Sequence, residues 1–448
     1  MIPEQARYIM KKLRENGYEA YLVGGCVRDT VMGRPVHDWD ITTSALPQDC
    51  SAIFNALGHH VIETGLKHGT ITVALDKVPY EITTYRIDGD YADHRHPDTV
   101  RFSKNVRDDL SRRDFTVNAM IMDEDGNVTD LFGGKQDIKD RIIRCVGDPE
   151  KRFDEDGLRI LRALRFSSVL DFSLSPDVCA AIRKKKDLLK EISAERIYAE
   201  LCRLVTGPGA GRILAENSEV LGVFMPQILP CVGFDQQNRH HDYDVWTHTC
   251  RAVGASVPEL NVRLALLFHD LGKPETFTKD EKGGHFYGHH EYSAKHARDI
   301  MNALRADHAT RDAVVTLVEL HDTVFSGGRK QLHKLLCRIG PQRTRELLQV
   351  HRADVAAQSE TCREERLAQA DGLFTILDEL LEQENCFSLK DMAVNGTDLV
   401  NLGAEPGPVI GQILKHLFGE ITEGRLKNDR EVLMKEAGRM IRGGREER

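Results

Sequence analysis

The spacing of hydrophobic residues changes near residue 150, and this change limits the folds that the chain can adopt. Before Gly147, short runs rich in β-branched residues, such as 69–75 and 80–85, alternate with helical stretches. Such runs suit the half-buried surface of a pleated sheet. From Arg152 onward, apolar residues recur at helical spacing to the end of the chain, which indicates amphipathic helices. The sequence therefore predicts an α/β head followed by an all-helical remainder.

The length of the chain suggests several domains. At 448 residues, about two to four are expected, because single hydrophobic cores rarely grow past a few hundred residues. We predict four parts: a head at 1–147, a helical neck at 148–225, a helical body at 226–385 and a helical tail at 386–448.

The composition excludes several classes of protein. No long apolar run is present, and the first residues lack the pattern of a secretory signal, so neither a membrane span nor secretion is expected. The ten cysteines form no Cys-x-x-Cys pair, which argues against a zinc ribbon or a disulfide framework and predicts a cytoplasmic location. Because the net charge is −9, any RNA binding would depend on a local basic surface.

Two aspartates follow a double glycine within the head. Asp38 and Asp40 flank position 39 on an expected strand, so both side chains project to one side. Two-metal phosphoryl transfer needs carboxylates that share a face, and Mg²⁺ is the expected ion. The turn at Gly24 and Gly25 lets backbone N–H groups approach phosphates, and Arg28 is placed to meet a phosphate or to hold the loop. The alternative is an ordinary turn followed by solvated acids.

Four later blocks complete a pattern that resembles a known family. They are the Arg112-Arg113-Asp114 block with Asn118, and residues 130–134, 155–166 and 192–201. Together with the double glycine and the Asp-x-Asp pair, they resemble the polymerase β nucleotidyltransferase superfamily. Within it they are similar to the class II tRNA nucleotidyltransferases, which comprise the CCA-adding enzymes and their poly(A) polymerase relatives. The resemblance covers roughly residues 20–205.

This resemblance implies a polymerase β-like palm and template-independent addition of CCA to tRNA 3′ ends. CTP and ATP would be the substrates and pyrophosphate the product. It further implies that Asp38 and Asp40 are catalytic and hold Mg²⁺, and that the Arg-Arg-Asp block meets the ribose and the triphosphate. The nucleotide-binding residues that it implies are Gly24, Gly25, Arg28, Arg112, Arg113, Asp114, Asn118, Asp156, Arg159, Arg162 and Arg165.

The 155–166 block has a physical basis for reading a base. Asp156 and Arg159 are three residues apart, which predicts one shared helix face. They offer carboxylate acceptors and a planar donor fork, enough to pair with the edge of C or A. Arg162 and Arg165 continue that face and could meet phosphate or RNA. The alternative is an ordinary surface ion pair.

Two further features of the head bear on the reaction. In the family, a flexible loop at the position of 88–97 is needed for the final A, so its presence here favours addition of the whole CCA over CC alone. His94 and His96 stand where Gly and Arg are more usual. Glu81, on an expected strand, would supply a third carboxylate, although a structural role is equally compatible with the sequence.

A series of histidines and aspartates runs through the helical body. Its sequence around His269-Asp270-Leu-Gly-Lys273 resembles the HD-domain signature, and imidazole with carboxylate suits a divalent transition metal. The resemblance implies that one metal ion is held by His248, His269, Asp270 and Asp354. It also implies that His289 and His321 are ligands of a second ion. Relatives with this domain act as phosphatases or cyclic phosphodiesterases on 2′,3′-ended RNA or nucleotides. The alternative is a degenerate HD fold that only packs against RNA.

The tail resembles that of bacterial CCA-adding enzymes, where helical domains hold the tRNA elbow. A local basic patch is one interpretation and a charge-balanced surface the other; the candidate residues are Lys415, His416, Arg425, Lys427 and Arg430. The expected partners are tRNA, CTP and ATP, without a membrane. Two rival functions remain: a poly(A) polymerase or CC- or A-adding enzyme on the same scaffold, and an HD phosphohydrolase with an inert head.

Overall fold

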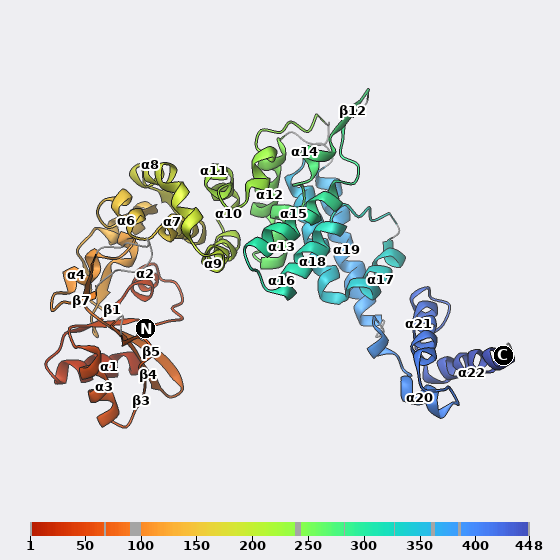
Figure 1. Cartoon of the computed structure of the whole chain (residues 1–448), viewed down its shortest axis with the longest axis horizontal. Helices are drawn as coiled ribbons and strands as arrows, with labels where there is room; N and C mark the ends of the chain where they lie inside the picture. The colour runs from red at the N-terminus through yellow and green to blue at the C-terminus, as the bar shows by residue number, and fades with distance from the viewer. Residues whose placement is uncertain are drawn as a thin grey trace. The chain divides into compact units, whose positions relative to one another are not determined.

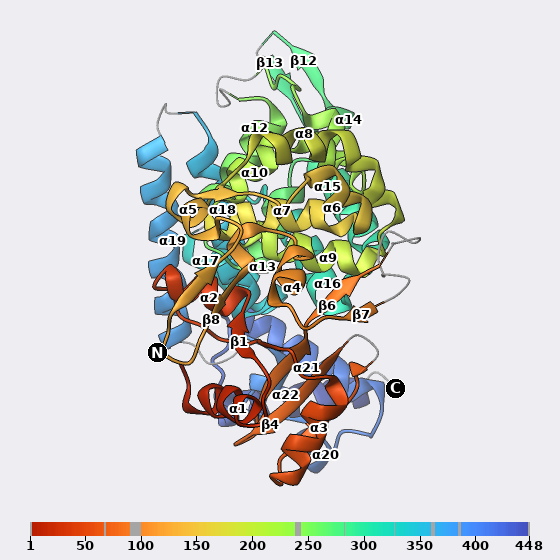
Figure 2. The ribbon, with the colours of Figure 1, turned by 90° about the vertical axis from the view of Figure 1, so that its left-hand side faces the viewer.

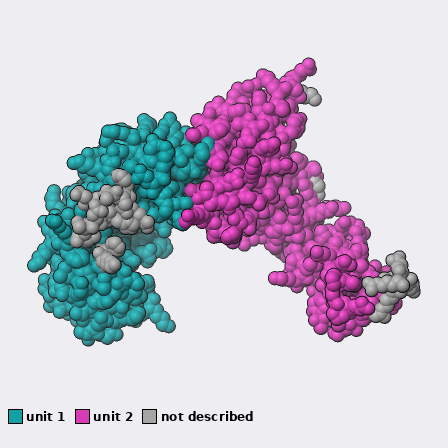
Figure 3. Space-filling view, viewed as in Figure 1, with its two compact units in different colours: residues 1–226 teal, residues 227–448 magenta. Residues whose placement is uncertain are grey.

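The computed structural model describes residues 2–66, 69–89, 100–237, 243–281, 283–326, 328–359, 363–383 and 387–446. The chain forms two compact units, Met1–Pro226 and Gln227–Arg448 (Figure 3). The loop expected at 88–97 falls largely on residues 90–99, which lie outside the described residues.

One mixed sheet forms the centre of the first unit. Its strands, in spatial order, are β3 (His60–Ile62), β4 (Thr70–Leu75), β5 (Val78–Thr84), β2 (Ile41–Thr43), β1 (Ala20–Val23), β8 (Met120–Met122) and β9 (Val128–Asp130). Strands β2 and β5 run parallel, while the other neighbours are antiparallel. This order places β2 between β1 and β5. Because β2 runs antiparallel to β1, the residues before β2 lie beside the end of β1.

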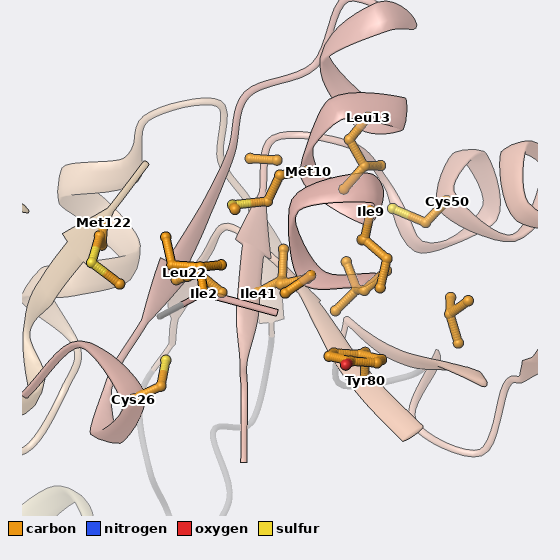
Figure 4. Packing of buried hydrophobic residues seen from close by; sticks show 14 of the residues in the cluster. Ile2, Ile9, Met10, Leu13, Leu22, Cys26, Ile41, Cys50, Tyr80 and Met122 are labelled. Atoms are coloured by element: carbon orange, nitrogen blue, oxygen red, sulfur yellow. The ribbon is translucent and has the colours of Figure 1, made fainter. Parts of the chain in front are cut away.

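Helices and short elements surround this sheet. They are α1 (Glu4–Glu15), α2 (Gly25–Val31), α3 (Pro47–Ala56), β6 (Arg86–Asp88) paired with β7 (Val100–Phe102), α4 (Val106–Ser111), η2 (Thr116–Asn118) and α5 (Gly134–Asp140). Helix α1 buries Ile9, Met10 and Leu13 on one face, and these pack with Leu22 of β1 and Ile41 of β2 (Figure 4). The apolar residues at helical spacing therefore explain why α1 forms and where it docks.

The second half of this unit is helical, as the change of periodicity predicts. Its elements are β10 (Ile142–Ile143), α6 (Pro149–Glu155), α7 (Leu158–Leu170), β11 (Ser173–Leu174), α8 (Pro176–Lys185), η3 (Lys186–Glu191), α9 (Ala194–Val205), α10 (Ala210–Glu216) and α11 (Ser218–Leu221), and η4 (Pro226–Cys231) crosses the boundary into the second unit. Strand β11 departs from the helical prediction. Ser173 and Leu174 form a parallel pair with β10 across the turn that ends α7, and such long-range pairing is invisible to local periodicity.

Helices dominate the second unit (Figure 1). They are α12 (Val245–Ala255), α13 (Leu260–Phe268), α14 (Lys273–Thr276), α15 (His289–Ala303), α16 (His308–Leu320), α17 (Gly328–Ile339), α18 (Pro341–Ala357) and α19 (Arg363–Gln383). A hairpin of β12 (Thr278–Asp280) and β13 (Gly283–His285) projects from them (Figure 2), and the sequence had predicted helix here. Gly283 explains the difference, because its φ of 122° is incompatible with a helix.

Residues after α19 form a small helical cluster with its own core. It consists of η5 (Leu389–Asp391), α20 (Gly396–Asn401), α21 (Pro408–Thr422) and α22 (Arg430–Glu446). A capping box between Asn395 and Asp398 begins α20, and Arg430 pairs with Asp398. Among the described residues, no helix has the length and apolarity needed to cross a membrane.

The core shared by α1 and the sheet gives a stability prediction. Leu22 is fully buried, whereas Leu57 at the end of α3 is exposed. We expect Leu22→Ala to lower the free energy of unfolding by about 2–5 kcal/mol through lost burial and a residual cavity. Urea unfolding of both variants measures this, and Leu57→Ala should match the wild type. Equal losses in the two variants would contradict this account of the core.

Candidate functional site

Asp40 lies directly before β2, at the N-terminal end of this central strand of the first unit's sheet. Its carbonyl oxygen accepts a hydrogen bond from the Val23 amide at 3.0 Å, so the β1–β2 ladder extends to this residue. The strand itself begins at Ile41, later than predicted, and Asp38 lies in the preceding loop. Both carboxylates are exposed. This position leaves them open to a ligand while β1 holds the backbone of Asp40.

Negative charge gathers around Asp40. Protein packed around one side of its carboxyl raises its pKa, the Glu81 carboxylate on β5 raises it further and Asp38 adds a smaller effect, while Arg113 opposes them. Glu81 therefore acts electrostatically on Asp40. A concentration of carboxylates of this kind favours a bound divalent cation.

The double-glycine turn lies close to the side chain of Arg113. Gly24 has a φ of 83° and precedes α2, which begins at Gly25. A Cβ on Gly24 would lie 3.1 Å from Nη1 of Arg113. Only glycine combines this backbone conformation with so close a guanidinium. The Arg113 side chain thus lies over the turn that the sequence predicts to meet phosphates.

Asp109 organises the two arginines of the Arg-Arg-Asp block. Its fully buried carboxylate accepts from Nε and Nη2 of Arg112 at 3.0 and 2.7 Å, and from Nη2 of Arg113 at 3.3 Å. Thr42 of β2 adds a hydroxyl at 3.3 Å. Burial would raise the pKa of Asp109, but Arg113 and Arg112 outweigh it and lower the pKa.

No role for Asp109 was predicted from the sequence. Its contact with the arginines could have been predicted, because Asp109, Arg112 and Arg113 stand at i, i+3 and i+4, the spacing of one helix face.

Arg28 holds its loop in a comparable way. It donates to Asn118 Oδ1 at 2.7 Å and to the carboxylate of Asp29.

Asp156 and Arg159 do not share one helix, which corrects the prediction. Helix α6 ends at Glu155 and α7 begins at Leu158, so the pair stands across a break. The reason is local: Asp156 is extended, with φ −144° and ψ 106°, and its Oδ1 accepts from the Leu158 amide at 3.0 Å. Its Oδ2 lies 2.8 Å from Nη2 of Arg196 on α9. The carboxylate is thereby fixed at the N-terminus of α7.

The arginines of α7 join this helix to the rest of the unit. Arg159 pairs with Glu155 and also donates to the carbonyl oxygen of Arg112 at 3.2 Å. Arg162 donates to the buried carboxylate of Asp114 through Nε at 2.8 Å. Together these contacts link the expected base-reading residues to the expected triphosphate-binding block.

Arg165 lies deeper than the other arginines of α7. Its Nε is 2.6 Å from Glu200 of α9, and its guanidinium lies 3.9 Å from the centre of the Phe166 ring. Burial lowers its pKa to about 10, and Glu200 opposes that shift. These contacts place Arg165 inside the neck.

The predicted histidines and aspartates of the second unit converge from five helices or helix ends. Potential ligand atoms lie within 4.8 Å of one another in two groups, which are His248, His269 and Asp354, and then Asp270, His289 and His321. Asp270 lies between the groups: Oδ2 is 3.2 Å from His269 and Oδ1 is 3.5 Å from His289. A third group joins His289 to His290 and Asp322, two neighbours that were not predicted as metal ligands from the sequence.

The orientation of three imidazoles fits a metal centre. Nδ1 of His269, His289 and His321 donates to the carbonyl oxygens of Leu266, Phe286 and Val318, at 2.6, 2.8 and 2.7 Å. Each bond fixes the tautomer and turns the Nε2 lone pair toward the cluster. Nε2 of His269 is buried and has no hydrogen-bond partner among the described residues. The donor set therefore suits a divalent ion that takes nitrogen and oxygen ligands.

The charges of the cluster agree with its geometry. Burial lowers the pKa of His321 to about 3, so this imidazole is neutral. Burial would also lower the pKa of His269, but Asp270 and Asp354 raise it to about 10. A positive charge is thus favoured between these two carboxylates, and either a proton or a metal ion can supply it.

Lys273 also faces this centre, although the sequence indicated it only as part of the HD signature. Its Nζ lies 2.7 Å from Oδ2 of Asp270 and 2.8 Å from Oε1 of Gln236.

Family profiles match most of the chain. Residues 20–144 match the poly(A) polymerase head domain, residues 171–231 match an RNA- and SrmB-binding site of polymerase A, and residues 285–437 match the tRNA nucleotidyltransferase domain 2.

Curated relatives carry one name. A CCA-adding enzyme of Geobacillus stearothermophilus is 48% identical over 274 residues, which cover 61% of this chain and 64% of that protein. One of Limosilactobacillus fermentum is 32% identical over 449 residues, covering 98% of this chain and 97% of that protein.

Solved structures extend the similarity to three dimensions. The crystal structure of a Bacillus stearothermophilus CCA-adding enzyme in complex with CTP is 30% identical, covers 100% of both chains and has a TM-score of 0.72. The Thermotoga maritima CCA-adding enzyme complexed with tRNA, at 17% identity and a TM-score of 0.59, shares the fold. Because the similarity to relatives above 30% identity runs over nearly the whole chain, the protein belongs to the family of CCA-adding enzymes.

Proposed function

We propose that this protein adds CCA to the 3′ end of tRNA, with CTP and ATP as substrates and no nucleic-acid template. The observation that carries the proposal is the full-length similarity to a CCA-adding enzyme crystallised with CTP. The geometry of the head supports it, since an open pair of carboxylates lies beside a glycine turn and an arginine pair. We place the protein in the cytoplasm, where tRNA is processed.

The reaction forms a bond between the tRNA 3′ oxygen and the α-phosphorus of the nucleotide, and breaks the bond from that phosphorus to pyrophosphate. Asp38 and Asp40 would hold Mg²⁺, which when bound would activate the hydroxyl and neutralise the triphosphate. Arg112 and Arg113, oriented by Asp109, bind the triphosphate. Gly24 lets the backbone N–H groups approach it.

Base selection falls to Asp156 and Arg159. Arg196 holds the first and Glu155 the second, so each presents acceptors or donors from a fixed position. The remaining nucleotide-binding residues are Gly25, Arg28, Asp114, Asn118 and Arg162. Arg165, because it is buried against Glu200, supports this site from within the neck.

We retain the four-part division as a functional assignment. Residues 1–147 form the palm, 148–225 the neck, 226–385 an HD-like body and 386–448 a tRNA-binding tail. In the tail, Arg425 pairs with Glu420 and Arg430 with Asp398, so we assign the contacts with tRNA phosphates to the other three candidates, Lys415, His416 and Lys427.

A second activity is proposed for the HD-like body: hydrolysis of phosphoesters by a divalent transition metal. The oriented Nε2 atoms of His269, His289 and His321 support it. His248, Asp270 and Asp354 complete the ligands. When bound, the ion supplies an activated water at neutral pH. The comparisons do not favour the rival functions, a poly(A) polymerase or an HD enzyme with an inert head.

Nucleotide addition depends on the aspartate pair. We expect Asp40→Asn to slow incorporation of CTP into tRNA lacking CCA by about a thousandfold or more, because several kcal/mol of charge stabilisation is lost. Gel analysis of extended tRNA measures this. Asp125→Asn, in an exposed turn of the same unit, should retain the wild-type rate. An undiminished rate for Asp40→Asn would refute the assignment.

Substrate choice separates the family's activities. With tRNA lacking CCA and CTP alone, we expect the addition of C residues that stops before the final position, and completion when ATP is added. A nucleotide-resolution gel reads each step. A poly(A) polymerase would add no C, and an enzyme that adds CC alone would not extend the product further when ATP is added.

The two activities should be separable by mutation. We expect His269→Ala with Asp270→Ala to remove bound metal and hydrolysis of nucleoside phosphates, while CCA addition continues. Elemental analysis and both assays test this, with His308→Ala, an exposed histidine outside the cluster, as the control. Loss of tRNA extension in the double variant would contradict the independence of the two sites, and a wild type that hydrolyses phosphoesters without extending tRNA would favour an HD enzyme with an inert head.

A further inference from the structure

Two cavities meet at the histidine–aspartate cluster of the second unit. The larger, of about 440 Å³, lies between α16, α18 and α19; the other, of about 300 Å³, lies against the β13–α15 segment. Both are lined by His321, Asp322, Asp354 and Gln358. A ligand in either cavity therefore reaches the proposed metal ions, and the remaining walls decide which cavity suits a substrate.

The larger cavity is lined by an arginine, Arg366. It lies on α19, and no carboxylate among the described residues pairs with its guanidinium. By contrast, Arg345 and Arg352 on the neighbouring helix α18 pair with Asp378 and Asp371. An unpaired guanidinium in a cavity is suited to a phosphate, which it binds through two parallel hydrogen bonds.

The cation of the smaller cavity is already engaged. Lys273 lies against Asp270 and donates to Gln236, so it has less capacity for a substrate anion. The acids that line the larger cavity, Asp322 and Asp354, oppose anion binding there until a metal ion neutralises Asp354. A phosphate held between that ion and Arg366 satisfies both charges.

The rest of the larger cavity suits a nucleoside. Phe325 and His351 form an edge-to-face ring pair with centroids 5.0 Å apart, and Leu373 adds an apolar surface. Gln358 is only 8% exposed, and its Oε1 has no hydrogen-bond partner among the described residues, although its amide donates to Asp354. Such a buried acceptor costs free energy unless a donor meets it, and a ribose hydroxyl is a donor of that kind. Cavities of this size hold small organic ligands.

We propose that this cavity is the substrate subsite of the metal centre and holds a nucleoside that carries a phosphate. Arg366 binds the phosphate opposite the metal ions, and Phe325 with His351 lines the base. The inference rests on the phosphohydrolase activity proposed above and adds the residues that determine its specificity.

Two measurements on the full chain, loaded with Mn²⁺, Co²⁺ or Ni²⁺, test the subsite. Calorimetry gives the Kd of inorganic phosphate, and a hydrolysis assay gives KM and kcat for adenosine 3′-monophosphate. We expect Arg366→Ala to raise both Kd and KM about tenfold, the loss of one charge-assisted contact. Arg352→Ala removes the same charge from a paired arginine outside both cavities and should change neither value. CCA addition should persist in both variants.

Aromatic variants locate the nucleoside. Phe325→Ala should raise KM about fivefold to tenfold, as expected for a lost base contact, and leave the Kd of phosphate unchanged. Tyr287→Ala removes the 77% exposed tyrosine that lines the smaller cavity and should leave KM unchanged. A raised KM for Tyr287→Ala and not for Phe325→Ala would overturn the proposal.

An unchanged Kd and KM in Arg366→Ala would also overturn it. Failure of the phosphohydrolase itself has a different signature: the wild type would hydrolyse no nucleoside phosphate with any of the three metals. The calorimetric effect of Arg366→Ala on phosphate binding would still decide whether the cavity is an anion site.

Discussion

The buried carboxylate of Asp109 is the interaction on which the head's site depends. One group without solvent contact orients Arg112 and Arg113 and also meets Thr42 of the strand that follows Asp40. Removing a carboxylate that two guanidiniums neutralise would leave those cations uncompensated. Arg113 also lies close to the double-glycine turn, because a Cβ on Gly24 would lie 3.1 Å from its Nη1. A single buried charge thus orients the two arginines proposed to bind phosphate and contacts the strand that follows the proposed catalytic aspartates.

The second unit uses the same physical device in another form. Backbone carbonyls at the ends of helices fix three imidazoles by their Nδ1 atoms, and the buried Asp270 and the partly buried Asp354 balance the charge. These three imidazoles lie where helices begin or end, whereas His248 lies within α12 and Asp354 within α18. His269 follows α13, His289 begins α15 and His321 follows α16. Side chains at such positions lie beside polar backbone groups that can orient them.

Sequence reasoning predicted the head, the helical remainder and the motifs, because each depends on local spacing. It was wrong where a local break interrupts a helix and where strands pair. Asp156 and Arg159 have the spacing of one helix face, yet Asp156 is extended, its side chain accepts from the Leu158 amide, and α6 ends at Glu155. Strands β11, β12 and β13 lie within a segment of helical periodicity. Pairing with another strand and a glycine with positive φ override local propensity at those places.

By itself, the sequence determined the order of motifs, the division into an α/β and a helical part, and the residues capable of metal chemistry. It could do so because side-chain chemistry and periodicity are written along the chain. Only the tertiary structure decided which charges are paired: it placed Arg165 against Glu200, gave Arg366 no ion pair with any described residue and put Asp109 between two arginines. Ion pairing depends on distances between residues far apart in sequence, and those distances exist only in the folded chain.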